Sequence, residues 1–194
     1  NSINSSGALT ITSTSENNGS LTMSSKDAMS TLYATADITI SGSAVVNATI
    51  NGGAQAIHSD PSSGTGSITI TGHAKVTAKN TRTLSQTSDA ADAHSVALLT
   101  GTYGSTSGTI TVSGSASLLA QGSTQALMCQ TFTHTNLTAK ASTNYTGANL
   151  VDCSDSNHAS YKYVHVYPVS ATVKYDVWVG DTQITSANKD SIQN

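Results

Sequence analysis

The sequence predicts an all-β solenoid, because one strand-turn-strand unit recurs along the chain without an internal gap. Each copy contains a run of alternating apolar and hydroxyl residues, a glycine turn, and a second alternating run. The copies lie at 37–48 (DITISGSAVVNA), 67–78 (SITITGHAKVTA) and 109–120 (TITVSGSASLLA). Such widely spaced units are typical of a stack in which each copy covers the apolar edge of its neighbour.

The composition fits one elongated domain with a narrow core. The chain has 194 residues, of which 37% are hydrophobic and 10% are charged, with a net charge of -3. With so few basic residues, the sequence does not indicate a positively charged surface that would bind nucleic acid. No apolar run reaches the ~18 residues of a membrane span. We therefore expect neither a nucleic-acid partner nor a membrane span, and no cofactor.

Three strand-like pieces precede residue 35, at 7–13, 19–25 and 28–34, and polar turns separate them. Each later strand pair is followed by a third piece that continues the alternation. The third pieces are 56–59 (AIHS), 97–100 (ALLT) and 126–129 (ALMC). The predicted coil therefore has three sides.

Stacking of these coils predicts which apolar residues form inward columns, since a solenoid must keep its strand register. The columns are Ile38, Ile68 and Ile110 on the first side; Val46, Val76, Leu118 and Leu137 on the second; and Leu32, Ile57, Leu98, Leu127 and Val151 on the third. The extra residues of one coil predict a polar corner loop at 80–93. Phe132 is expected to fill the space of a missing first-side strand.

The pattern changes near the C-terminus. Residues 161–167 (YKYVHVY) read as one strand with Val164 and Val166 on one face, ended by Pro168. This strand is expected to be the last rung or a cap. We predict a parallel β-helix over 1–167 and a C-terminal cap, or the start of a further module, over 168–194.

The strand pairs and the tail YDVWVGDTQITSANKDSI resemble right-handed parallel β-helix modules of bacterial surface proteins, of the pectin-lyase-like type with carbohydrate-binding-domain repeats. Residues of the tail match the motif that opens such a module, although Asp181 stands where a second glycine is usual. The matches are Trp178, Val179, Gly180, Gln183, Thr185, Asn188 and Asp190. The resemblance implies an extracellular, cell-surface location, a polysaccharide or host-glycan partner, and a longer multi-module chain.

The predicted fold is thus a right-handed parallel β-helix of about five irregular three-sided coils with a β-strand cap. Two groups of residues are candidates for ligand binding on it. An outward ladder, if exposed, would form a platform for sugar rings, and aromatic residues near the C-terminus would add to it. Alternatively, the corner loop or the C-terminal strands cover the ladder. The ladder is Tyr33, His58, Leu99, Met128 and Asp152, and the aromatic residues are Tyr103, Tyr161, Tyr163 and Tyr167.

On a surface with few charges, ring stacking and short hydrogen bonds are expected to dominate binding. Lys75, Lys79 and Lys140 are the alternative anchors, for an anionic ligand. Screening by salt distinguishes the two kinds of contact.

Catalytic and metal-binding patterns are sparse. One Glu and one Arg occur, so a calcium-dependent lyase site has too few partners and no enzymatic activity is expected. A cation at Asp152, Asp155 and Asn157 is a weak candidate. Cys129 and Cys153, if stacked in adjacent coils, form either a disulfide or a pair of buried thiols.

These features favour a non-enzymatic binding or adhesion module of a bacterial cell-surface protein that contacts polysaccharide. Two alternatives stay open, a structural stalk that spaces other domains and a degenerate polysaccharide lyase.

Overall fold

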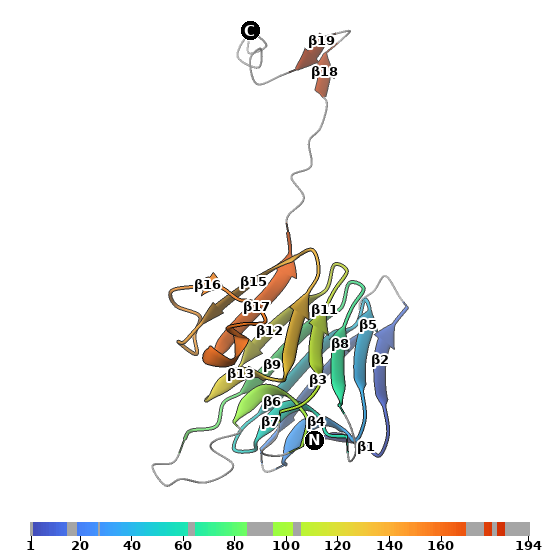
Figure 1. The fold of residues 1–194 in the computed structure, drawn as a ribbon. Coiled ribbons are helices and arrows are strands. Elements are labelled where there is room, and N and C mark those ends of the chain that lie inside the picture. Colours follow the sequence, from blue (N-terminus) through green and yellow to red (C-terminus); the bar gives the residue numbers. More distant parts are fainter. Residues whose placement is uncertain are drawn as a thin grey trace.

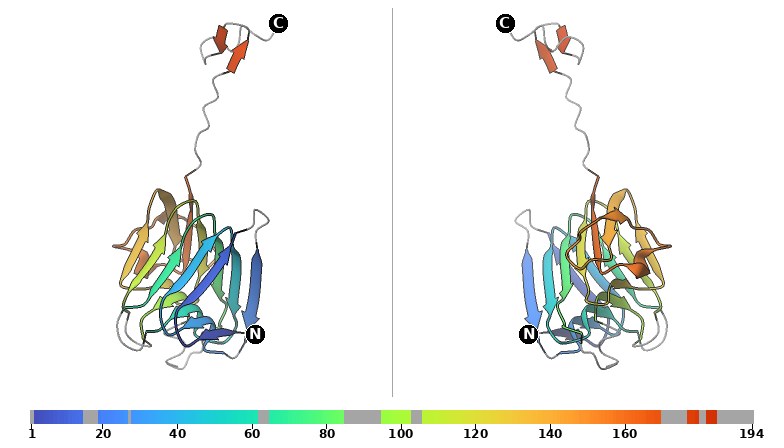
Figure 2. Two further views of the ribbon diagram at one scale, coloured as in Figure 1. Left: turned by 90° about the vertical axis from the view of Figure 1, so that its right-hand side faces the viewer. Right: turned by 90° about the vertical axis from the view of Figure 1, so that its left-hand side faces the viewer.

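The computed structural model describes residues 2–14, 19–26, 28–61, 65–84, 95–102, 106–169, 177–179 and 182–184. The described part is all-β apart from one 3-10 turn, η1 (His158–Ser160). Parallel strands lie side by side in three sheets, as Figures 1 and 2 show. The result agrees with the predicted all-β class and is consistent with a β-helix.

The first and third sheets each contain five parallel strands. The first sheet has the order β14-β11-β8-β5-β2, and the third has the order β1-β4-β7-β10-β13. The first consists of β2 (Leu9–Ser13), β5 (Ile38–Gly42), β8 (Ser67–Ile70), β11 (Thr109–Val112) and β14 (Thr131–His134). The third consists of β1 (Ile3–Ser5), β4 (Ser30–Ala34), β7 (Gln55–Ser59), β10 (Val96–Thr100) and β13 (Gln125–Met128).

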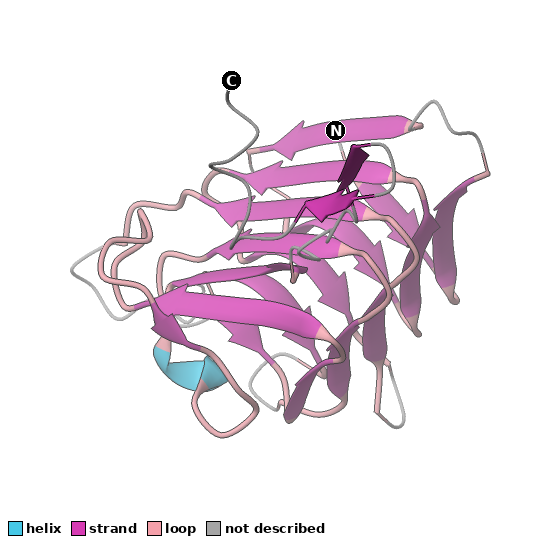
Figure 3. Ribbon diagram, turned by 90° about the horizontal axis from the view of Figure 1, so that it is seen from above, coloured by secondary structure: helices cyan, strands magenta, loops and turns pink. Residues whose placement is uncertain are grey.

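The second sheet has seven strands in the order β16-β15-β17-β12-β9-β6-β3. They are β3 (Ser20–Ser25), β6 (Val45–Ile50), β9 (Lys75–Asn80), β12 (Ser117–Gln121), β15 (Leu137–Ser142), β16 (Val151–Asp152) and β17 (Tyr163–Pro168). From β2 to β15 the chain visits the first, second and third sheets in a repeating order. Figure 3 shows the resulting side-by-side stack of strands from above.

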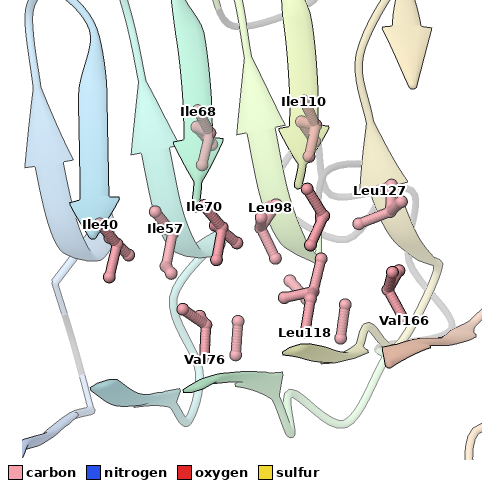
Figure 4. Close-up of a cluster of buried hydrophobic side chains, with 14 of the residues drawn as sticks. Ile40, Ile57, Ile68, Ile70, Val76, Leu98, Ile110, Leu118, Leu127 and Val166 are labelled. Carbon is pink, nitrogen blue, oxygen red and sulfur yellow. The ribbon is translucent and has the colours of Figure 1, made fainter. Parts of the chain in front are cut away.

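The inward columns pack into one core between the three sheets (Figure 4). Ile68 pairs with Ile38 and Ile110, as the repeat predicts. Val76 pairs with Val46 and Leu118 on the second sheet. The third sheet aligns Leu32, Ile57, Leu98 and Leu127. These registers confirm the first three members of the predicted columns on the first and second sheets and the first four on the third.

The turns between first and second sheets depend on glycine. Gly42, Gly72 and Gly114 have φ angles of 66°, 73° and 70°, a region that favours glycine. They also stack, because a Cβ on Gly72 would lie 2.9 Å from the Gly42 carbonyl oxygen, and one on Gly114 would lie 2.9 Å from that of Gly72. The predicted glycine turns thus require glycine for both backbone angle and space.

The C-terminal end of the stack differs from the prediction. Strand β17 runs antiparallel between β12 and β15, so Leu118 faces Val166 rather than Leu137. Val151 is also not in the third sheet, because β16 pairs antiparallel with β15 and places Val151 beside Ala141. The predicted columns therefore end one member early on these two sides.

Two further expectations are wrong at this end and at the corner loop. Phe132 does not replace a missing strand, since it belongs to β14 and pairs with Ile110. Asn80 is the buried last residue of β9 rather than part of the loop, and residues 85–93 of the predicted loop lie outside the described residues.

In the predicted tail, β18 (Val177–Val179) and β19 (Thr182–Ile184) form an antiparallel pair. Trp178 lies opposite Gln183 in this pair. The remaining motif residues, Gly180, Thr185, Asn188 and Asp190, lie outside the described residues, as does Asp181.

Candidate functional site

Lysine and aromatic side chains share the outer face of the second sheet. Alternation along β9 turns Val76 and Ala78 into the core and the flanking lysines outward, and β17 likewise buries Val164 and Val166. We call this surface the lysine–tyrosine face. It comprises Lys75 and Lys79 on β9, Tyr163, His165 and Tyr167 on β17, and Lys140 on β15.

The aromatic rings of β17 form a continuous row. The ring centroids of His165 and Tyr167 are 4.8 Å apart, and those of Tyr163 and His165 are 6.4 Å apart with an interplanar angle of 80°. His165 lies between Leu119 of β12 and Lys140 of β15. Rings that are half-buried and fixed by neighbours on both sides offer a stacking surface with little entropy left to lose.

The lysine–tyrosine face is electrostatically positive. Burial lowers the pKa of His165, so this imidazole is neutral at pH 7 and the positive charge comes from lysines. Lys140 pairs with Asp152, with its Nζ 2.7 Å from Oδ1, and this contact raises the pKa of Lys140 and lowers that of Asp152. Lys75 and Lys79 have no ion pair within the described part of the chain.

The predicted outward ladder has the expected register but not the expected exposure. His58 pairs with Tyr33 and Leu99, and Leu99 pairs with Met128. However, His58 and Leu99 are both 0% exposed, so the expected open platform is wrong at these two positions. Asp152 does not belong to the ladder, because β16 lies in the second sheet.

The other predicted ligand residues are dispersed. Tyr33 and Met128 remain half-buried on the third sheet, on strands β4 and β13. Tyr161 precedes β17 and packs against the core, whereas Tyr163 and Tyr167 lie on the lysine–tyrosine face. Tyr103 lies outside the described residues. The structure thus brings together two of the four predicted aromatic residues.

The weak cation candidate is not formed. Asp152 binds Lys140, and the Asp155 Oδ1 accepts the Phe132 backbone N–H at 2.6 Å. The Asn157 Oδ1 accepts the Ser154 backbone N–H at 2.8 Å. Across the described ranges, no group of three or more His, Cys, Asp or Glu side chains is placed to hold a metal.

Sequence reasoning missed a buried contact between Cys129 and His158. The Cys129 Sγ lies 3.4 Å from His158 Nε2, and the His158 Nδ1 lies 2.7 Å from the backbone oxygen of Asp155. The Asp155 oxygen only accepts, so the shorter contact assigns an N–H to Nδ1, while Nε2 lies within reach of both the thiol and the Cys129 carbonyl oxygen, the latter at 3.3 Å. The Asp155 carboxylate is 3.9 Å from Nδ1 and already binds Phe132, so it does not orient the imidazole as a third catalytic group would.

Cys129 and Cys153 are both buried and free. Burial raises the pKa of Cys129 to about 12 and that of Cys153 to about 11. A thiol at such a pKa is protonated at neutral pH and is a poor nucleophile. The Cys129–His158 contact is therefore structural, and of the two alternatives for the cysteines the structure contains buried thiols.

We expect neither thiol to react with a thiol reagent in the native protein at pH 8, because both are protonated and inaccessible. After unfolding in guanidinium chloride under anaerobic conditions, a colorimetric thiol assay should count both cysteines. A count of zero after unfolding would contradict the free-thiol arrangement and indicate a disulfide. Rapid reaction in the native state would contradict the burial of the pair.

Within the described ranges no helix has the length and apolar character needed to cross a membrane. The resemblance to β-helix modules of bacterial surface proteins stays a hypothesis. No protein-family model matches the chain, and no curated protein or solved structure shows significant similarity to it.

Proposed function

We propose that the protein is a non-enzymatic binding module that contacts an acidic polysaccharide through the lysine–tyrosine face. The observation that carries this proposal is the placement of Lys75 and Lys79, which have no ion-pair partner among the described residues, on the same outer face as the ring row of β17. We further infer that residues 1–167 form a right-handed parallel β-helix of about five coils. A cell-surface location follows from the resemblance of the repeats.

The spacing of the strands suits an extended ligand. β9 and β17 are separated by β12 alone, and two strand spacings amount to about 10 Å. A chain that crosses the strands can therefore contact lysine at one point and an aromatic ring at the next. Carboxylates on such a chain would pair with Lys75 and Lys79, and the apolar faces of its sugar rings would stack on Tyr163 and Tyr167.

The lack of carboxylates among the described side chains of this face supports binding rather than calcium-dependent catalysis. Among the described outward side chains of β9, β12, β15 and β17 there is no carboxylate. Asp152 lies at the edge of the sheet and is held by Lys140. A calcium-dependent lyase requires carboxylates to hold calcium against the uronate, and the described part of the face offers none.

The test is calorimetric titration of the purified protein with oligogalacturonate and with a neutral oligosaccharide of the same length. The acidic ligand should bind more tightly, and its affinity should fall when NaCl is raised from 50 to 500 mM. The double variant Lys75→Gln/Lys79→Gln should lose about tenfold in affinity at low salt, and Tyr167→Ala should lose about tenfold at any salt.

Lys26→Gln is the matched control, because Lys26 is an exposed lysine that follows β3 and lies outside the lysine–tyrosine face. It should bind like the parent protein, and all variants should keep the parent melting temperature. Equal binding of neutral and acidic ligands at all salt concentrations would overturn the acidic assignment. Failure to bind either ligand would leave the structural stalk, and depolymerisation of the ligand would indicate a lyase.

A further inference from the structure

A separate cavity of about 250 Å³ opens at the outer side of the third sheet, near the N-terminal end of the stack. It is smaller than the ~300–1,000 Å³ typical of drug-sized ligands, so it suits a single small ring. The residues that line it come from β1, from β4 and the turn before it, and from the residue after β7. They are Asn4, Ala28, Met29, Ser30, Tyr33 and Asp60.

The polar end of this cavity is held in a fixed geometry. The Tyr33 hydroxyl donates to the Asp60 Oδ2 at 3.0 Å. The Tyr33 ring meets the His58 ring edge-on, with centroids 5.4 Å apart and an interplanar angle of 73°. His58 is fully buried, and its Nε2 lies 2.9 Å from the Gly101 carbonyl oxygen. A buried side chain thus positions the tyrosine, and the tyrosine positions the carboxylate.

Among the described residues that line the cavity, Asp60 alone is charged, and none is a cation. Asp60 also has no ion pair with another described residue. The Ser30 hydroxyl donates its hydrogen bond to the Gln55 Oε1 at 3.0 Å, so it does not donate to the Asp60 carboxylate. Burial and the hydrogen bond to Asp60 raise the pKa of Tyr33, so the phenol remains a protonated donor.

A ligand that complements these groups carries a cation and an apolar body. A carboxylate beside an aromatic ring favours an ammonium group. The ammonium donates a charge-assisted hydrogen bond to the carboxylate and makes a cation–π contact with the ring. Met29 is 62% exposed at the edge of the cavity and supplies an apolar surface for a ring. Asn4 can hydrogen-bond to hydroxyl groups.

We propose that this cavity binds an amino sugar with a free, unacetylated amino group, with the ammonium on Asp60 and Tyr33. The site is independent of the lysine–tyrosine face, because the two lie on different sheets. It would select against anionic sugars, which the same carboxylate repels. The protein then recognises two kinds of sugar, one at each surface.

The experiment is titration of the full chain with glucosamine, N-acetylglucosamine and cadaverine, followed by calorimetry and saturation-transfer NMR. Glucosamine should bind at least tenfold more tightly than N-acetylglucosamine, because acetylation removes the charge. Asp60→Asn should weaken glucosamine binding at least tenfold, and Tyr33→Phe should weaken it several-fold while the ring remains. Asp152→Asn, which removes an exposed carboxylate on the second sheet, should leave it unchanged.

Equal affinity for glucosamine and its acetylated form, or undiminished binding by Asp60→Asn, would overturn the assignment. Tighter binding of cadaverine than of glucosamine would show that the cavity recognises an amine without a sugar ring, which contradicts the proposal. Binding of oligogalacturonate to Asp60→Asn should equal that of the parent protein. The amino-sugar site and the polysaccharide face can therefore fail separately.

Discussion

Replacing Val76 by Asp should prevent the protein from folding. Val76 is 2% exposed and lies between Val46 and Leu118 in the middle of the second sheet. An unpaired carboxylate there has no partner in a core made of apolar side chains, and its burial costs about 3–5 kcal/mol or more. That cost is comparable to the whole stability of many domains, about 5–15 kcal/mol. Far-UV circular dichroism and the yield of soluble protein measure the outcome.

The neighbouring substitution Thr77→Asp is the matched control, because Thr77 points to the outer face of the same strand. It introduces the same charge at a half-buried, solvent-facing position and should fold with a slightly lower melting temperature. If soluble Val76→Asp protein kept the parent spectrum and melting temperature, the inward orientation of the Val76 column would be wrong.

The second large effect is expected for Asn80→Leu. Asn80 is fully buried at the end of β9, and its Nδ2 donates to the Ala54 carbonyl oxygen at 2.7 Å, with longer contacts to those of Gly53 and Val96. Its Oδ1 accepts the Arg82 backbone N–H at 2.9 Å. Leucine has a similar volume but removes all of these side-chain hydrogen bonds. The Ala54 carbonyl oxygen still accepts the Val96 N–H at 3.0 Å, so the cost, about 1–3 kcal/mol for each group left without a partner, comes from the other contacts.

We expect a loss of about 3 kcal/mol in the free energy of unfolding, measured by urea denaturation with an unchanged m-value. Asn47→Leu is the control, since Asn47 occupies an outward position on β6 and its Nδ2 bonds only to the Thr22 hydroxyl within the described residues. That variant should change stability by less than about 1 kcal/mol. Equal effects of the two substitutions would show that Asn80 does not hold the corner together.

The regular part of the strand stack could be predicted because aligning the repeated units also aligns the residues that pair between neighbouring strands. Alternation of Ile and Thr determines which residues face inward, and glycine marks the turn, so aligned copies give aligned strands. The pairings of Ile38 with Ile68 and of Val46 with Val76 follow directly. The third sheet was also predicted, although its strands are not part of the repeated unit.

The end of the stack was not predictable in this way. Alternation in residues 161–167 shows that Val164 and Val166 share a face, but it reads the same for a parallel and an antiparallel strand. Only the rest of the chain decides that β17 returns between β12 and β15. Val151 looked like a third-side residue for the same reason, since a short alternating piece does not identify the sheet that it joins.

The candidate sites were also predictable only in part: the sequence indicated which way a side chain points from its strand, but not which distant segments lie beside it. The outward position of His58 follows from its strand, whereas its burial depends on segments far along the chain, because its Nε2 contacts Gly101. The Cys129–His158 contact joins residues 29 positions apart through a turn that has no repeat signal. Lys75 and Tyr167 were each noted, but their shared face depends on the unpredicted placement of β17.

The position of β17 also affects how the protein can be assembled during synthesis. In each of the three sheets the earlier strands pair with the strand of that sheet made just before them, so they can join the sheet in the order in which they leave the ribosome. β15 cannot complete its pairing in this order, because its neighbour β17 is made about twenty residues later. The place between β12 and β15 is filled only when β17 has been made, so the second sheet is completed out of chain order.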